Sequence, residues 1–496
     1  MIHRRQFLIG ASAGSIAACI RGPALRTKQP QITHGVQAGD VQTDRALVWA
    51  RCDERARMIV EWSTLASFAG ARRVAGSIVG PTMDHTGWVE LRGLPPGQTI
   101  SYRVRFEREA ERGASAWTTG RFAMPGANRL RFAWTGDTCG QGFGRNPEWG
   151  GLRGYAAIRK AEPAFLLHSG DLIYADNPIV AELTLADGRV WRNLTNERVG
   201  RVAQELDDFR ARFAYTYEDE HVRALAAEVP ILAAWDDHET HNNWWPGQQL
   251  EDDRYLEKDA TTLAARALKA VREWTPISGP TIQRVIHYGP LLDVIVVDLR
   301  AFRTPNDPNR GETGAMMGAT QARWLVNALA GSKARWKIVA CDQPLALVIG
   351  DGPGDQRQEG YGNGEGPPLG RERELAGVLA EIKQRAVSNV VWLTADVHYA
   401  AAHHFDPSRA TGAEFTPFWE FIAGPIHAGT FGPNPLDPTF GPEIRFQWAP
   451  PAGTGNLAPW DGLQSFGTVD VSAEALHVAL VGIDGRIRYE IDIPRS

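Results

Sequence analysis

The chain has 496 residues, a formal net charge of -5, a pI near 6.3 and 43% hydrophobic residues. This length accommodates one large domain and a smaller one, and the composition is ordinary for a globular protein. Because the chain has no polybasic character, we expect no nucleic-acid partner, whereas a small anionic substrate is compatible with local positive charge.

The N-terminus, residues 1–30, is typical of an export signal followed by a linker. Arg4 and Arg5 precede a short apolar run, a pattern that predicts transport by the twin-arginine export machinery. The run is too short for a membrane span of about 20 residues. Cys19 follows Ile16–Ala18 as in a lipoprotein cleavage box. We favour a soluble periplasmic or secreted protein, with a lipid anchor at Cys19 as the alternative.

Residues 31–125 are expected to form a small β-sandwich domain. Turn residues such as Pro95–Gly97 separate short predicted strands, which are Arg45–Ala50, Met58–Trp62, Gly87–Leu91 and Thr99–Phe106. Regular short strands of this kind favour a sandwich.

Residues 126–496 are predicted to form a larger α/β domain. Apolar runs typical of strands buried on both faces each lead to a polar cluster. The runs and their polar residues are Leu130–Thr135 with Asp137, Ala164–Leu167 with Asp171, Val229–Trp235 with Asp236–His238, Leu291–Val297 with Asp298, Trp336–Ala340 with Asp342, and Val390–Leu393 with Asp396. Helices are predicted at Gly318–Ala330 and Arg371–Arg385, and a closing hairpin at Ala475–Gly482 and Arg486–Ile493. Open α/β sheets place their sites at strand ends, so we expect the polar clusters to form one.

The side chains at these strand ends match the needs of metal-assisted phosphoester hydrolysis. That reaction requires an activated water and neutralisation of charge at phosphorus, and two neighbouring metal ions supply both. Carboxylates suit hard cations, whereas His, thiolate and phenolate suit transition metals such as Fe or Zn. Taken singly, Asp137 or Asp171 would be interpreted as a helix cap. Their joint occurrence favours metal ligands, because several unpaired buried carboxylates would be costly without cations.

Five blocks of the sequence resemble, in order, the alkaline phosphatase D (PhoD-like) family of calcineurin-like metallophosphoesterases. The blocks are Gly136–Cys139, Gly170–Tyr174, Trp235–Glu239, Asp298–Arg300 and Ala395–His398. The resemblance extends over nearly the whole chain, including Gly35–Asp40. It implies a two-sheet metallophosphoesterase sandwich flanked by helices, with an N-terminal fibronectin-like β-sandwich, and an exported metal-dependent phosphoric-ester hydrolase.

The resemblance also implies a ligand set, which falls on Asp137, Cys139, Asp171, Tyr174, Asp237, Asp396 and His398. Asp171 corresponds to a carboxylate that touches both metals, and Tyr174 to a phenolate that favours Fe(III). Asp137 and Cys139 are alternatives for one position. Asp396 stands where the superfamily usually has His, which makes that site harder. The implied cofactors are therefore Fe(III) and Ca²⁺, with Zn or Mn as alternatives.

The same resemblance assigns two catalytic roles. His238 corresponds to the His that contacts the transferred phosphoryl group, and Arg300 to a phosphate-binding Arg, with Arg303 as a secondary candidate. Asp342 or Gln343 falls where another His ligand is often found. Asp298 is interpreted as structural.

Our mechanistic hypothesis is in-line attack on the phosphorus of a small phosphoester by a metal-bound hydroxide, with neutral-to-alkaline activity. The first alternative is a phosphodiesterase or phospholipase D-like hydrolase that uses the same site. The second is a calcium-stabilised exported binding protein, which would not turn over any substrate.

Overall fold

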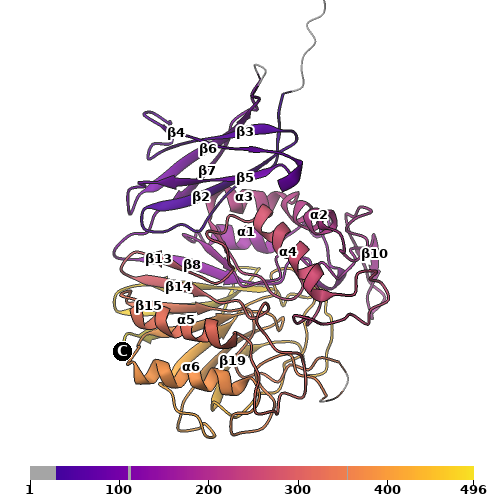
Figure 1. The fold of residues 1–496 in the computed structure, drawn as a ribbon, viewed down its shortest axis with the longest axis vertical. Coiled ribbons are helices and arrows are strands. Elements are labelled where there is room, and N and C mark those ends of the chain that lie inside the picture. Colours follow the sequence, from indigo (N-terminus) through magenta and orange to yellow (C-terminus); the bar gives the residue numbers. More distant parts are fainter. Residues whose placement is uncertain (1–28, 110–112, 353, 355) are drawn as a thin grey trace, which may run out of the picture.

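The computed structural model of the protein describes residues 29–109, 113–352, 354 and 356–496. The predicted export signal and Cys19 lie outside the described residues. Within them, no helix has the length and apolar character needed to cross a bilayer. Two large β-sheets dominate the fold, with a smaller layer of strands at the N-terminal end (Figure 1).

The first large sheet has nine strands in the order β22-β21-β20-β8-β9-β12-β1-β2-β5. Their bounds are β1 Ile32–Gly39, β2 Arg45–Cys52, β5 Thr86–Arg92, β8 Leu130–Thr135, β9 Leu166–His168, β12 Ile231–Ala233, β20 Ser465–Val471, β21 Ala475–Gly482 and β22 Ile487–Pro494. Strands β8, β9 and β12 are parallel, so their carboxyl ends lie at one edge. Strands β21 and β22 form the predicted closing hairpin.

The second large sheet has seven strands in the order β13-β14-β15-β16-β18-β17-β19. The strands are β13 Arg284–Tyr288, β14 Leu292–Val296, β15 Trp336–Ala340, β16 Val390–Thr394, β17 Ala400–Phe405, β18 Phe418–Ile422 and β19 Pro442–Trp448. Strands β14, β15, β16 and β18 run parallel. Their near-continuous apolar sequences are buried, as expected for strands covered on both faces.

The N-terminal strands form two layers, one of which continues the nine-stranded sheet. The separate four-stranded sheet has the order β4-β3-β6-β7, with β3 Ala56–Ser63, β4 Arg72–Val79, β6 Thr99–Glu107 and β7 Thr118–Ala123. It packs against β1, β2 and β5 through a shared apolar core. Because β1 pairs with β12 through Gly39 and Ile231, this sandwich is joined to the larger domain by a continuous sheet.

Helices cover the outer faces of the sheets. Helices α5 (Gly318–Gly331) and α6 (Glu372–Gln384) lie on the seven-stranded sheet, where Leu325 and Leu379 share a buried cluster with Val339 of β15 (Figure 1). Both agree with the predicted helices. The remaining helical and strand elements are α1 Arg153–Lys160, α2 Leu206–Tyr217, α3 Glu220–Glu228, α4 Ala260–Trp274, the short 3₁₀ segments Pro81–Met83, Gly140–Gly142 and Pro459–Asp461, and the small hairpin of β10 Glu182–Thr184 and β11 Val190–Arg192. The predicted fold class, a helix-flanked two-sheet sandwich with an N-terminal strand domain, is confirmed.

Candidate metal centre

The candidate ligands follow the carboxyl ends of parallel strands from both large sheets. Asp137 follows β8, Asp171 follows β9, Asp237 follows β12, Asp342 follows β15, and both Asp396 and His398 follow β16. Parallel strands bring such residues together at one edge, which is how the predicted site is assembled.

The backbone at several of these positions is held in an unfavourable conformation. Asp137, Asp171, Asp396 and His398 have φ values of 68°, 53°, 67° and 61°. A non-glycine residue in this region costs about 1–3 kcal/mol and persists only where the surrounding structure enforces it, often at functional sites. Gly170 has φ 113°, and a Cβ there would lie 2.5 Å from the Cβ of Asp236. A glycine at this position lets the loops after β9 and β12 meet.

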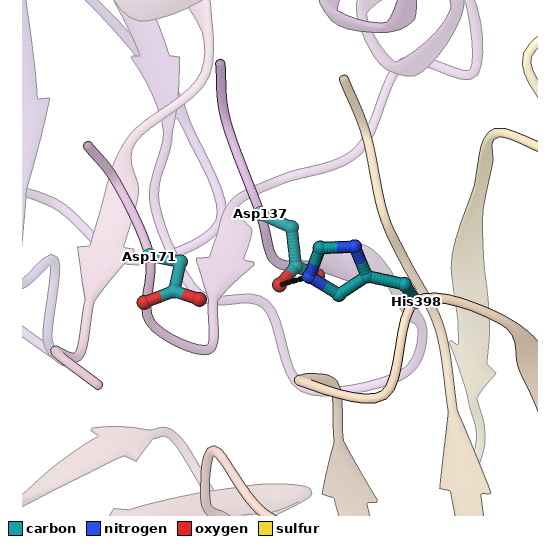
Figure 2. Close-up of side chains that lie close together, drawn as sticks. All are labelled: Asp137, Asp171 and His398. Atoms are coloured by element: carbon teal, nitrogen blue, oxygen red, sulfur yellow. Dashed lines mark ion pairs between the residues drawn. The ribbon is translucent and has the colours of Figure 1, made fainter. Parts of the chain in front are cut away.

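The first ligand group consists of Asp137, Asp171 and His398, whose ligand atoms lie within 4.8 Å of one another (Figure 2). His398 Nε2 lies 3.1 Å from Asp137 Oδ1. The Tyr174 hydroxyl lies 2.8 Å from His398 Nε2 and donates to Asp137 Oδ1 at 3.2 Å. His398 Nδ1 donates to the carbonyl of Gly429, which leaves the Nε2 lone pair facing the group.

Two further ligand groups overlap with the first. Asp171, Asp237 and His238 form the second group, and Asp236, Asp237 and Asp396 form the third. Asp171 belongs to the first two groups and Asp237 to the last two. Shared carboxylates of this kind are what two neighbouring metal ions require, because one side chain can then contact both ions.

Unpartnered buried oxygens show that these residues fit a metal centre. Asp137 Oδ2, Asp237 Oδ1 and both carboxyl oxygens of Asp342 are buried without a hydrogen-bond donor among the described residues. Burial raises the pKa of Asp171 well above its usual range, and Asp237 and Asp236 raise it further. Burial likewise raises the pKa of Asp342 and Asp396. Cations bound here would offset this concentration of negative charge.

His238 lies beside the ligand groups with its ring orientation fixed. Its Nδ1 lies 2.7 Å from Asp176 Oδ1, and its ring stacks on Tyr174 with centroids 4.0 Å apart. Burial lowers the pKa of His238, but Asp176 and Asp237 outweigh burial and raise it to about 10. His238 lines the cavity described below, and its contact with the phosphoryl group stays a prediction.

Arg300 lies buried among carboxylates beside the ligand groups. Its side chain is 0% exposed, forms ion pairs with Asp236 and Glu359, and lies 3.6 Å from Asp342 Oδ2. It is not among the residues that line the cavity. Arg303 is also buried and donates to the carbonyl of Glu359. The placement of Arg300 supports a role in positioning carboxylates, and its direct contact with phosphate stays a prediction.

Cys139 is not brought to the metal centre. It belongs to none of the ligand groups formed by the described residues, and it is 3% exposed within the apolar core. Burial raises the pKa of its thiol to about 12. Asp137 belongs to a ligand group and Cys139 does not, so the geometry favours Asp137 for the position that the sequence left open. Cys52 and Cys341, whose state the sequence also left open, are free and buried.

Some residues of the site were not identified from the sequence. Asp236 belongs to the third ligand group, and Asp176 holds His238. Glu239 accepts hydrogen bonds from the backbone N–H groups of Asp171, Leu172 and Asp236, and so connects the loops after β9 and β12. The run from Asp236 to Glu239 was a visible signal for two of these residues, whereas the position of Asp176 two residues after Tyr174 gave none.

A cavity of about 340 Å³ opens onto the ligand groups. Asp237, His238, Asp396 and His398 all line it. A larger groove of about 680 Å³ lies between β7, α1 and α3, but it contains none of the ligand groups. The smaller cavity is therefore the candidate active site, because members of the ligand groups line it.

The fold and the cluster define the class of metallophosphoesterases, in which carboxylates and histidines at strand ends of two facing sheets hold metal ions. The chain belongs to the PhoD-like phosphatase family: that family matches residues 132–479, and the N-terminal domain of PhoD-like phosphatases matches residues 17–125. The chain is thus a metal-dependent phosphoester hydrolase.

Individual relatives agree with this assignment. Alkaline phosphatase D of Bacillus subtilis (strain 168) is 27% identical over 458 residues, which cover 83% of this chain and 75% of the relative. A solved structure of PhoD matches with a TM-score of 0.69 and 20% identity, over 96% of this chain and 90% of that one. The purple acid phosphatase PPD1 from yellow lupin (Lupinus luteus) seeds matches with a TM-score of 0.58 and 13% identity, over 94% and 75% of the two chains. The two structures support the fold.

Proposed function

We propose that this chain is an exported alkaline phosphatase that hydrolyses phosphomonoesters at a binuclear metal centre. The observation that carries the proposal is the set of three overlapping ligand groups, which share Asp171 and Asp237 beside one cavity. Family membership supports the reaction class, and the geometry of the ligand groups supports the proposed choice of residues.

The two metal positions differ in their ligand chemistry. Asp137, Asp171, Tyr174 and His398 would hold one ion, while Asp171 and Asp237 would hold the other, joined by Asp396, which shares a ligand group with Asp237. A set that includes phenol and imidazole suits Fe(III), whereas a set of carboxylates suits Ca²⁺, and Zn or Mn are alternatives. Bound metal ions supply an activated water and neutralise charge on the phosphoryl group.

The side chains of the chain itself bind and orient the substrate. Because Asp176 engages Nδ1 of His238, Nε2 is the nitrogen that remains for a substrate in the cavity. A protonated His238 would donate from Nε2 to a phosphoryl oxygen or to the oxygen of the departing alcohol. Arg300 would keep Asp236 and Glu359 in place behind the metals, as a positioning residue.

Metal analysis combined with a two-substrate assay tests the proposal. We expect two metal ions per purified chain and faster hydrolysis of 4-nitrophenyl phosphate than of bis(4-nitrophenyl) phosphate. If Tyr174 binds Fe(III), the preparation is coloured; an active, colourless and iron-free preparation would remove iron from the proposal. Faster diester hydrolysis would instead support the phosphodiesterase or phospholipase D-like alternative. Absence of turnover at every metal loading, with stability lost in chelator, would support a calcium-stabilised binding protein.

Export is a separate part of the proposal and rests on Arg4, Arg5 and Cys19, which precede the described residues. We expect the double variant Arg4→Lys and Arg5→Lys to accumulate in the cytoplasm, because the twin-arginine export machinery recognises the pair. Cys19→Ala tests for a lipid anchor: release of a membrane-bound protein by this variant would show that Cys19 is lipidated. An unchanged location of both variants would oppose this part of the proposal.

A further inference from the structure

The walls of the catalytic cavity are formed by neutral side chains. Apart from the ligand groups, Glu359 and backbone positions, the cavity is lined by Gln141, Asn242, Asn243, Ile349, Val397, Phe431 and Asn434. No Lys or Arg is present among the described residues that line it. Beyond its phosphoryl group, a substrate therefore meets amides, apolar surface and Glu359 among the described lining residues. Arg357, which is not among them, is engaged by Asp351.

Four of the side chains that line the cavity are amides, and two of them, Asn243 and Asn434, present a hydrogen-bond acceptor. Asn243 donates from Nδ2 to Asp351 Oδ1 at 3.0 Å, and Asn434 donates from Nδ2 to the carbonyl of Val348 at 3.4 Å. A carbonyl or an ionised carboxylate can only accept, so both amide orientations are fixed by their partners. The Oδ1 atoms of Asn243 and Asn434 are then the ends left for a ligand, and neither atom is buried.

The other two amides add donors. Gln141 Oε1 accepts from the backbone N–H of Gly429 at 3.0 Å, which fixes its orientation and leaves Nε2 as a donor. The side chain of Asn242 is exposed and has no hydrogen-bond partner among the described residues, so it offers both a donor and an acceptor. Phe431, whose ring centroid lies 5.4 Å from that of His398, adds a half-buried apolar face.

We propose that the leaving group of the substrate is an uncharged alcohol with several hydroxyl groups, such as a sugar, and that the four amides select against a second negative charge. This inference rests on the proposed function and deepens it. A hydroxyl group both donates and accepts, so it matches a rim that combines fixed acceptors with donors. A carboxylate or second phosphate only accepts, and it would face Oδ1 of Asn243 and Asn434 without a cation.

Two substrates that differ in this one property provide the test. Glucose 6-phosphate and 6-phosphogluconate both carry a phosphomonoester on a six-carbon hydroxylated chain, but only the second has a carboxylate. With the metal-loaded enzyme, we expect kcat/KM for glucose 6-phosphate to exceed that for 6-phosphogluconate at least about tenfold. Equal rates, or a preference for 6-phosphogluconate, would overturn the inference. Hydrolysis of 4-nitrophenyl phosphate without measurable hydrolysis of glucose 6-phosphate would overturn it as well.

Variants that introduce a positive charge at the rim test whether the amides cause the preference for an uncharged leaving group. Asn242→Lys places a cation at an exposed position of the rim, and Asn434→Lys replaces a fixed acceptor by a cation. We expect both to shift the ratio of the two kcat/KM values towards 6-phosphogluconate, by about tenfold or more. Asn128→Lys, at an exposed position that does not line the cavity, should leave the ratio unchanged.

The ratio of the two kcat/KM values distinguishes a failure of this inference from a failure of the proposed function. Because both rates are measured on the same preparation, a partial loss of folding cancels in the ratio. An unchanged ratio in both rim variants would overturn the role of the amides. Absence of hydrolysis with all three phosphomonoesters, in metal-loaded enzyme, would overturn the proposed function itself and this inference with it.

Discussion

Two buried acidic regions of this molecule stabilise negative charge in different ways. The carboxylate of Asp40 is fully buried, but it accepts from Arg284 Nε and Nη2 and from the backbone N–H and the hydroxyl of Ser278. At the metal centre, by contrast, buried oxygens of Asp137, Asp237 and Asp342 have no donor among the described residues. Complete pairing indicates a structural carboxylate, whereas missing partners indicate a position for a cation.

Burial alone does not make this distinction, because both regions lie in the interior. It is the partners that differ: Asp40, directly after β1, pairs with Arg284 of β13, and its carboxylate is fully paired without a ligand. The carboxylates that follow β12 and β15, which are Asp236, Asp237 and Asp342, share one buried guanidinium, that of Arg300, which also pairs with Glu359. If this difference separates catalysis from stability, substitutions in the two regions should affect different properties of the protein.

Asp171→Asn should have the largest effect. Asp171 belongs to two ligand groups, so its substitution weakens both metal positions at once. Metal ions supply several kcal/mol of transition-state stabilisation, and we expect kcat for 4-nitrophenyl phosphate to fall at least about 10³-fold. Steady-state kinetics and metal analysis of the same preparation measure the effect. Asp208→Asn, at a buried aspartate paired with Arg201 outside the ligand groups, is the matched control. Unchanged turnover in Asp171→Asn would contradict the binuclear assignment.

Asp40→Asn should show the opposite pattern, with a large loss of stability and intact catalysis. The substitution leaves the guanidinium of Arg284 buried without its counter-charge. Breaking a buried ion pair from one side costs about 3–5 kcal/mol of unfolding free energy. Chemical denaturation measures this loss, and kcat per folded, metal-loaded molecule should stay at the wild-type value. If Asp40→Asn lost activity and bound metal while remaining folded, the separation of the two regions would be wrong.

Glu239→Gln should weaken the metal centre without removing a ligand. Both oxygens of Glu239 accept from backbone N–H groups of the ligand-bearing loops, and an amide nitrogen in place of one oxygen would face those donors. Loss of such a supporting contact typically lowers metal affinity about 10–100-fold. Titration with a competing chelator measures the affinity. Glu273→Gln, at a buried glutamate paired with Arg210, should retain wild-type affinity. Equal affinities in the two variants would refute the supporting role.

The sequence predicted where the strands lie. It did not predict which side chains contact the polar residues that follow those strands. The apolar run Leu130–Thr135 coincides with β8, because a strand buried on both faces leaves a continuous signal. Asp137, Asp171 and Asp237 could be proposed because they directly follow such runs and match family blocks. Arg300 could not be placed, since the sequence does not show that Asp236 and Glu359, far apart in the chain, enclose its guanidinium. The role that the family resemblance assigned to Arg300 therefore has to be compared with the position of this residue in the tertiary structure.

The same limit applies to Cys139 and to the N-terminal strands. Cys139 lies two residues after Asp137, and only the backbone conformation decides which side chain turns towards His398. Similarly, the strand pattern of residues 31–125 predicted a sandwich, but the pairing of β1 with β12 depends on a contact between Gly39 and Ile231. Local periodicity carries no information about such distant pairs.

Glu372 is a buried acid that avoids charge by staying protonated, and its substitution should have the smallest effect. Burial and the neighbouring Asp437 raise its pKa from the ordinary 4.5 to about 9, so it stays protonated near neutral pH. Its Oε2 accepts from Asn363 Nδ2 and from the N–H of Leu369, contacts that a glutamine oxygen can replace.

A raised pKa in the folded state stabilises the fold below pH 4.5, and this contribution is lost as pH rises towards 9. Glu372→Gln removes the loss, so the unfolding free energy of the variant relative to wild type should increase between pH 5 and 9. One pKa unit corresponds to about 1.36 kcal/mol, and we expect an increase of at least about 1 kcal/mol. Denaturation across this range measures it, with Glu312→Gln at an exposed position as the control. A difference that does not vary with pH would show that Glu372 is ionised in the fold. The ionised Glu372 carboxylate would then need a counter-charge, as that of Asp40 does. Protonation would then not be the means by which this fold neutralises Glu372.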